Sequence, residues 1–233
     1  MTSGEILCQI LLVNALHKKD VVGQGKEARA VTNVVLMGSG EPLDNYDEVL
    51  KFLRNVTAEG GLCISARNIS LSTCGLVDGI RRLAREGLPI TLSVSLHAAT
   101  DEKRSAIMPI NNKWNIKALL DACVRYYSVT GRRISFEYTL ISGKNDTQSD
   151  AEELARLLTS AFRPVGAPIH VNLIRVNEVA ETGFKKGSAE EANRFAATLE
   201  RMGVVATVRR RLGADVNAAC GQLRRATMAR NAE

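Results

Sequence analysis

A run of apolar residues ends in a carboxylate whose backbone is restricted by its neighbours. The segment VVLMGSGEPLDNYDEVL runs from Val34 to Leu50 and places Glu41 directly after Gly-Ser-Gly and before Pro42. Glycine allows a sharp turn off a strand and leaves amide groups accessible, and the residue before a proline avoids helical angles. The carboxylate would then be held extended, where it can accept charge-assisted hydrogen bonds from a ligand ammonium. An ordinary loop with an exposed glutamate fits the same pattern.

The cysteines are the other candidates for chemistry. There are five of them, namely Cys8, Cys63, Cys74, Cys123 and Cys220. No two stand at CxxC or CxxxC spacing, so the sequence carries no recognisable metal-binding motif. Small neighbours leave room around the sulfur of Cys220, and nearby arginines favour its thiolate. A buried thiol packed as a small hydrophobe is the simpler local explanation for Cys220, and the same explanation serves the other four.

Composition and charge limit the class of protein. The chain has 233 residues, of which 45% are hydrophobic and 24% charged, as in an ordinary soluble globular protein. No apolar run approaches the ~20 residues of a membrane helix. Its 31 basic and 25 acidic residues give a net charge of +6, which permits nucleic-acid binding without requiring it. Irregularly spaced thiols and the lack of a secretory signal indicate a cytoplasmic location.

Strand and helix patterns alternate along the chain. The first twenty residues predict an amphipathic helix capped by Thr2 or Ser3. Strands are expected at residues 32–37, 68–73, 90–97, 133–141, 169–176 and 204–209. Helices are expected after the capping boxes Asn45–Glu48 and Ser188–Glu191, over residues 76–86, after Asn115 and around Leu154–Ala161. The alternation predicts parallel βαβ units in a single domain spanning residues 1–233.

Polar and apolar residues alternate within the predicted strands. One face carries polar side chains such as Ser93, Ser95, His97, Glu137 and Asn172. A flat sheet covered on both sides would show continuous apolar runs, so a curved sheet with a polar lumen and outer helices fits better. An antiparallel sheet with one wet face gives the same alternation, but the intervening helices argue against it. The predicted fold is therefore α/β, a partial (β/α) barrel, with its site at the carboxyl ends of the strands.

Six short motifs occur in a recognisable order: MGSGEP, LSTCG, SVSLHA, MPINNKWNI, VNLIRVN and GADVNAACGQL. Together they resemble the RlmN/Cfr family of radical S-adenosylmethionine (SAM) enzymes, from Thr2 to about Leu223. These enzymes methylate adenine in 23S ribosomal RNA, and RlmN also acts on certain transfer RNAs. The resemblance implies a partial barrel of the radical SAM type, an open parallel curved sheet with outer helices whose first strand is missing here.

The resemblance also implies roles for particular residues. Gly40 and Glu41 would hold the SAM amino group, and the other SAM contacts would come from Ser72, Ser95, Leu96, His97 and Asn177. One SAM would methylate Cys220. A second SAM, cleaved reductively at a 4Fe–4S cluster, would give a 5′-deoxyadenosyl radical that abstracts hydrogen from the S-methyl group, and the carbon radical would add to adenine. The implied partners are 23S rRNA, tRNA and an electron donor such as flavodoxin or ferredoxin, with no membrane.

The sequence departs from the family at its beginning. The CxxxCxxC cluster motif, the upstream resolving cysteine and an N-terminal RNA-binding domain would all precede MTSGEI, so the chain is expected to be a fragment of a longer enzyme. The expected reaction is methylation of adenine carbon 2. Cfr-like methylation of carbon 8, or an inactive remnant that binds SAM or RNA, are the alternatives. A small-molecule aldolase or lyase would want a lysine at a strand end, and no predicted strand contains one.

Overall fold

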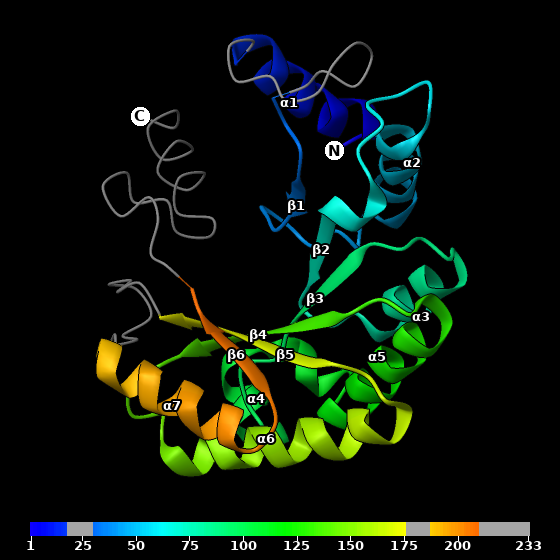
Figure 1. Cartoon of the computed structure of the whole chain (residues 1–233). Coiled ribbons are helices and arrows are strands. Elements are labelled where there is room, and N and C mark those ends of the chain that lie inside the picture. The colour runs from blue at the N-terminus through cyan, green and yellow to red at the C-terminus, as the bar shows by residue number, and fades with distance from the viewer. Residues whose placement is uncertain (18–29, 176–186, 210–233) are drawn as a thin grey trace, which may run out of the picture.

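The computed structural model describes residues 1–17, 30–175 and 187–209, which form one curved sheet with helices along its outer side (Figure 1). The strands are β1 (Val34–Leu36), β2 (Ile69–Thr73), β3 (Thr91–Ser95), β4 (Ile134–Leu140), β5 (Ile169–Arg175) and β6 (Val205–Val208). The helices are α1 (Ser3–Leu16), α2 (Tyr46–Thr57), α3 (Val77–Arg85), α4 (Asp101–Ile107), α5 (Ile116–Thr130), α6 (Gln148–Phe162) and α7 (Ala189–Arg201). Short 3-10 turns, η3 (Ala66–Asn68), η4 (Pro109–Asn112) and η5 (Arg163–Val165), complete the described elements.

All strand pairs are parallel, and the spatial order β1-β2-β3-β4-β5-β6 follows the chain. The prediction of an open parallel sheet with outer helices is confirmed. The longest ladder joins β4 to β5, from the pair Ile134–Ile169 to the pair Leu140–Arg175. At the other end, β1 pairs only with β2 within the described part of the chain, and Val35 is 57% exposed. This strand therefore forms an open edge, as the sequence predicts.

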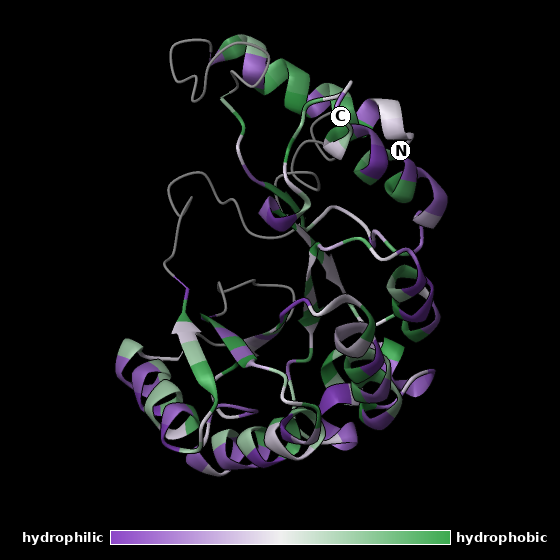
Figure 2. Ribbon diagram, turned by 45° about the vertical axis from the view of Figure 1, so that its right-hand side comes forward, coloured by the Kyte–Doolittle hydropathy of each residue, from purple (hydrophilic) through white to green (hydrophobic). Residues whose placement is uncertain are grey.

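The apolar face of the sheet packs against the outer helices. Leu71, Val94, Phe136 and Val171 come from four successive strands, and each is at most 1% exposed. Aromatic contacts tie strands to helices, with the rings of Phe136 and Phe162 5.4 Å apart edge to face. Hydrophobic and hydrophilic residues mix along the outer helices, as expected for helices with one buried side (Figure 2).

Two of the predicted capping devices are confirmed. Thr2 and Glu5 form a reciprocal capping box at α1, and Ser188 and Glu191 form another at α7. The predicted box between Asn45 and Glu48 is wrong. The Asn45 side-chain amide instead donates to the Met1 carbonyl (2.7 Å), and the Glu48 carboxylate accepts from the Ser3 amide (2.6 Å). The start of α2 thus binds the start of α1, and this tertiary contact replaces the local one.

Helix α1 forms as predicted, but its description as amphipathic is wrong. Of the apolar side chains in α1, Ile10 alone is buried, while Leu12 and Leu16 are 60% and 71% exposed. The reason is spacing, because the apolar residues between positions 6 and 16 lie all around the helix. Within the described ranges, no helix is both long and apolar enough to cross a bilayer.

Candidate functional site

Glu41 lies where the chain leaves β1 and reaches across to the end of β2. One carboxylate oxygen accepts a hydrogen bond from the Cys74 amide (2.7 Å), and the other accepts from the Leu43 amide (3.0 Å). The turn that carries it needs glycine, since Gly38 and Gly40 have φ angles of 137° and 107°. A side chain at Gly40 would meet nothing within 4 Å, so the main chain there is open to a ligand. The half-buried carboxylate keeps further lone pairs for a donor.

A cleft of about 850 Å³ opens beside this turn, between α1, the edge strand β1 and the start of α2. Its lining includes Gly38, Gly40 and Glu41 together with apolar side chains of α1 and β1, among them Ile6 and Val35. The volume is in the range of small-molecule sites, which are mostly apolar with a few placed polar groups. The open edge of the sheet and the Glu41 turn thus share one hollow, whose lining does not include Ser72, Ser95 or His97.

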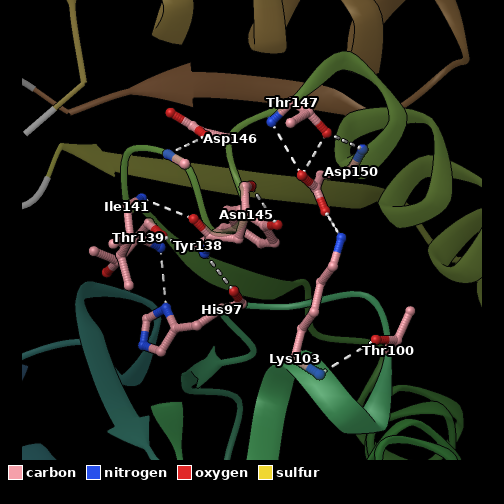
Figure 3. Close-up of polar contacts among 11 residues, drawn as sticks. His97, Thr100, Lys103, Tyr138, Thr139, Ile141, Asn145, Asp146, Thr147 and Asp150 are labelled. Carbon is pink, nitrogen blue, oxygen red and sulfur yellow. Dashed lines mark hydrogen bonds and ion pairs between the residues drawn. The ribbon is translucent and has the colours of Figure 1, made fainter. Parts of the chain in front are cut away.

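His97 follows β3 and is held by three hydrogen bonds, of which Figure 3 shows those with Thr139 and Asn145. Its φ of 59° is the left-handed conformation, which costs a residue other than glycine about 1–3 kcal/mol and persists only where the surroundings hold it. Its amide donates to the Glu137 carbonyl (3.3 Å), its carbonyl accepts from the Asn145 side chain (2.8 Å), and its Nδ1 accepts from the Thr139 amide (3.0 Å).

The Thr139 contact determines the proton on the ring. Because Nδ1 accepts a hydrogen bond, the neutral ring carries its proton on Nε2, which can donate to a ligand. Burial, helped by the nearby Arg104 guanidinium, lowers the pKa of His97 from 6.5 to about 4. At neutral pH the rim therefore presents a neutral imidazole donor after β3 and the Glu41 carboxylate acceptor after β1.

Asn145 is a supporting residue that the sequence did not reveal (Figure 3). It is 2% exposed, and its side chain donates to the His97 and Thr139 carbonyls (both 2.8 Å) while accepting from the Ile141 amide (2.7 Å). The Tyr138 hydroxyl donates to its carbonyl (2.8 Å). The only signal was the SGKND stretch between a strand and a helix, which is typical of any turn.

The other predicted SAM residues fall on the same strands. Ser72 and Ser95 are half-buried on the polar face of β2 and β3. Leu96 is fully buried, its amide donates to the Glu137 carbonyl (3.0 Å), and its own carbonyl accepts from Arg104 (3.1 Å). The structure thus brings the rim residues of β1, β2 and β3 together. Asn177 and Cys220 lie outside the described residues.

Glu137 occupies the lumen, as the alternation of β4 predicts. It is 3% exposed, one oxygen accepts from the Asn172 amide group (2.9 Å), and the other lies 3.9 Å from the Arg209 guanidinium. Burial raises the pKa of this carboxyl. Further polar pairs line the same face, including Ser70–Ser93 (3.0 Å) and Ser135–His170 (2.9 Å). The lumen is therefore a hydrogen-bonded polar layer.

Two of the four described cysteines have thiols that burial keeps protonated. Cys123 is buried and Cys74 half-buried, and burial raises the pKa of each thiol to about 12, so neither is a thiolate at neutral pH. This agrees with the structural interpretation of Cys74 and Cys123. The same interpretation is wrong for Cys8, which is exposed on α1, and Cys63 is only half-buried. Across residues 1–17, 30–175 and 187–209, no cluster of three or more His, Cys, Asp or Glu side chains could hold a metal ion.

An open parallel sheet with outer helices, and with a carboxylate and an imidazole after its first and third described strands, fits a partial barrel of the radical SAM class. Residues 13–158 match the family model of the Radical SAM superfamily, and the chain belongs to this superfamily. Among curated proteins, it is 53% identical over 225 residues to a Clostridium perfringens (strain SM101) protein named probable dual-specificity RNA methyltransferase RlmN. The alignment covers 97% of this chain and 60% of that relative, so the chain spans about three fifths of the relative's length.

Solved structures give the same result. A radical SAM methyltransferase from Sphaerobacter thermophilus superposes with a TM-score of 0.85 at 43% identity, over 95% of this chain and 61% of that one. A domain of a pyruvate-formate lyase-activating enzyme from Bacteroides vulgatus has a TM-score of 0.59 at 17% identity, over 77% of this chain and 100% of that one, which is a likeness of fold alone. The resemblance found in the sequence motifs is thereby confirmed.

The neutral state of His97 predicts a pH-dependent stability. Between pH 6.5 and 4 the unfolded chain binds a proton at His97 that the native ring does not, so this contribution is complete above pH 6.5 and is lost as the pH falls to about 4. The unfolding free energy lost is up to about 3 kcal/mol, and it is smaller to the extent that solvent reaches the ring.

Urea unfolding at pH 7 and pH 4.5 should show a smaller difference in unfolding free energy for His97→Asn than for wild type, because asparagine does not titrate. Asparagine is the substitute because it tolerates the left-handed backbone. His17→Asn, at an exposed histidine, should behave as wild type. Equal pH dependence in His97→Asn and wild type would contradict the prediction.

Proposed function

We propose that this chain is the SAM-binding barrel of an RNA methyltransferase that adds a methyl group to carbon 2 of an adenine in 23S rRNA and in tRNA. Membership of the Radical SAM superfamily and 53% identity to a protein named RlmN support the class of reaction. The structural observation that carries the proposal is that the Glu41 acceptor and the His97 donor follow β1 and β3 at the same rim of the parallel sheet. SAM offers both complements, an ammonium for the carboxylate and acceptor atoms for the Nε2 proton.

Each rim residue then has a role in binding. Gly40 leaves the main chain open beside the ligand, and Glu41 accepts from the SAM ammonium. The remaining polar contacts come from the hydroxyls of Ser72 and Ser95 and from the Nε2 proton of His97. Leu96 contributes through its main chain, which joins Ser95 to His97. Asn177, which lies outside the described residues, is proposed as a further SAM contact from its sequence motif alone. When bound, SAM supplies both the methyl group and the radical chemistry.

The 4Fe–4S cluster that the superfamily implies does not fit the residues of this sequence. The five cysteines include no CxxxCxxC spacing, and the described residues contain no metal-binding group. The roles proposed here therefore involve only this chain's own side chains. Cluster binding, reduction by flavodoxin or ferredoxin and contact with RNA belong to the complete protein, which we place in the cytoplasm.

Cys220 is proposed as the covalent methyl carrier. SAM would transfer a methyl group to its thiolate, and this carbon would afterwards be delivered to adenine. Two other cysteines are less suited to this role, since burial keeps the thiols of Cys74 and Cys123 protonated at neutral pH. Cfr-like delivery to carbon 8 uses the same residues and is the second candidate.

Nucleoside analysis tests the proposed function directly. The complete gene is expressed in a bacterial strain lacking RlmN, and 23S rRNA and tRNA are digested and examined by mass spectrometry. We expect 2-methyladenosine to reappear in both RNAs, because the proposed protein has both substrates. Appearance of 8-methyladenosine instead would favour the Cfr-like alternative. Neither nucleoside, with the protein folded and its cluster loaded, would refute the proposal.

A further inference from the structure

A fully buried arginine lies behind the candidate site. Arg104, in α4, is 0% exposed, although its side chain carries a positive charge. Its guanidinium donates four hydrogen bonds, three to main-chain carbonyls and one to a side-chain amide oxygen. The acceptors are Leu96 O (3.1 Å), Ser95 O (3.1 Å), Cys74 O (2.9 Å) and Asn111 Oδ1 (2.9 Å).

No carboxylate pairs directly with Arg104 within the described residues. The nearest acidic partner acts through a relay, in which the Asn111 side-chain amide donates to the Asp101 carboxylate (3.0 Å) while its oxygen accepts from Arg104. Burying an unpaired cation is expensive, and an apolar residue of similar volume would cost less. Stability alone is therefore a poor reason for arginine at this position.

The carbonyls that Arg104 binds belong to the two loops of the candidate site. Cys74 donates its amide to Glu41 (2.7 Å) and gives its carbonyl to Arg104, so it is held between a carboxylate and a guanidinium. Ser95 and Leu96 immediately precede His97. One planar side chain thus sets the spacing between the end of β2, to which Glu41 is bonded, and the end of β3, which leads into His97.

We propose that Arg104 is a positioning residue for SAM, which fixes the Glu41 carboxylate and the His97 imidazole at the separation that the ligand requires. The inference rests on the proposed function, because it takes SAM as the ligand of this rim. Arginine suits the task because its donors diverge in a rigid plane and can hold two strand ends at once. Lysine would supply the positive charge but not the diverging planar donors. The Arg104 cation also disfavours a charged imidazole, which supports the neutral donor state of His97.

The test measures two properties in the 233-residue chain. The first is the affinity for SAM by calorimetry, and the second, without ligand, is NMR of the Cys74 amide and of the His97 ring. We expect Arg104→Met to lower SAM affinity at least tenfold, to speed hydrogen exchange at the Cys74 amide, and to raise the pKa of His97. Arg104→Lys should keep the pKa of His97 low but still lose affinity, and it serves as the second variant if Arg104→Met folds poorly.

Tyr126→Phe is the matched control. The buried Tyr126 hydroxyl donates to the Ile90 carbonyl (3.0 Å) at the beginning of β3, so the variant removes a side-chain bond to the strand at the end away from the site. It should lose stability and keep SAM affinity. Wild-type affinity, Cys74 exchange and His97 titration in the folded Arg104 variants would overturn the inference. If wild type binds no SAM yet the NMR changes occur, the proposed ligand is wrong and the positioning role stands.

Discussion

Replacing Cys220 with serine in the complete protein is expected to abolish adenine methylation, with a loss of at least ~1,000-fold in rate, as for removal of a covalent nucleophile. Carbon 2 of adenine is electrophilic, and no enzyme base makes it a nucleophile, so direct transfer from the SAM sulfonium fails. The one-carbon unit must first be held on a soft nucleophile, for which a thiolate is best. Serine has no comparable nucleophilicity at neutral pH. Mass spectrometry of digested 23S rRNA measures the product.

Other cysteine variants are the controls. Cys63→Ser and Cys123→Ala should largely retain methylation, and alanine is chosen at the buried Cys123 because a hydroxyl there would lack a partner. After incubation with SAM and reductant, the tryptic peptide that contains Cys220 should carry an added methyl or methylene mass. Wild-type methylation by Cys220→Ser would show that the proposed carrier and mechanism are wrong.

Glu41→Ala is expected to weaken SAM binding by about 10- to 150-fold, since it removes a charge-assisted hydrogen bond worth roughly 1.5–3 kcal/mol. The structure adds a second effect. The amides of Cys74 and Leu43 lose their acceptor, so the variant should also unfold about 1–3 kcal/mol more easily while keeping its fold. Calorimetry with SAM and urea unfolding measure the two losses separately.

Glu41→Gln separates charge from geometry. Its side-chain oxygen can still accept from one amide, so more stability should remain while SAM affinity stays low. Asp44→Asn, three residues away at an exposed position, removes a nearby charge outside the site and should change neither property. Unchanged SAM affinity in both Glu41 variants would remove this residue from the binding site.

Much of the fold could be predicted because period-2 alternation and helical spacing are local signals. All six strands were placed to within two residues at their ends, and their polar face proved to be the lumen. What failed depended on contacts distant in sequence. Asn45 has every local mark of a helix cap, yet its side chain binds Met1 because α1 packs beside it. Helix α4 has only seven residues, Asp101–Ile107, and no apolar period to reveal it.

The candidate site was predictable where a motif fixes the backbone. Glu41 could be placed because two glycines and a proline determine its surroundings. Arg104 could not, because three of its four partners are main-chain carbonyls, which leave no trace in side-chain types. The left-handed His97 was equally hidden, since the groups that hold it, Thr139 and Asn145, follow it by more than forty residues.

The strictly sequential order of the strands has a consequence for how the chain folds. Among the described residues, each strand pairs only with its neighbours along the chain, so none of these pairings waits for a segment from the far end of the sequence. The entropic cost of closing each loop is then small, and the sheet can grow by adding one βα unit at a time to an existing edge. We expect the seven-residue ladder between β4 and β5 to form first, and β1, with three residues, to be added last. The strand that carries the Glu41 loop would therefore join late, and the ligand site would form only as folding is completed.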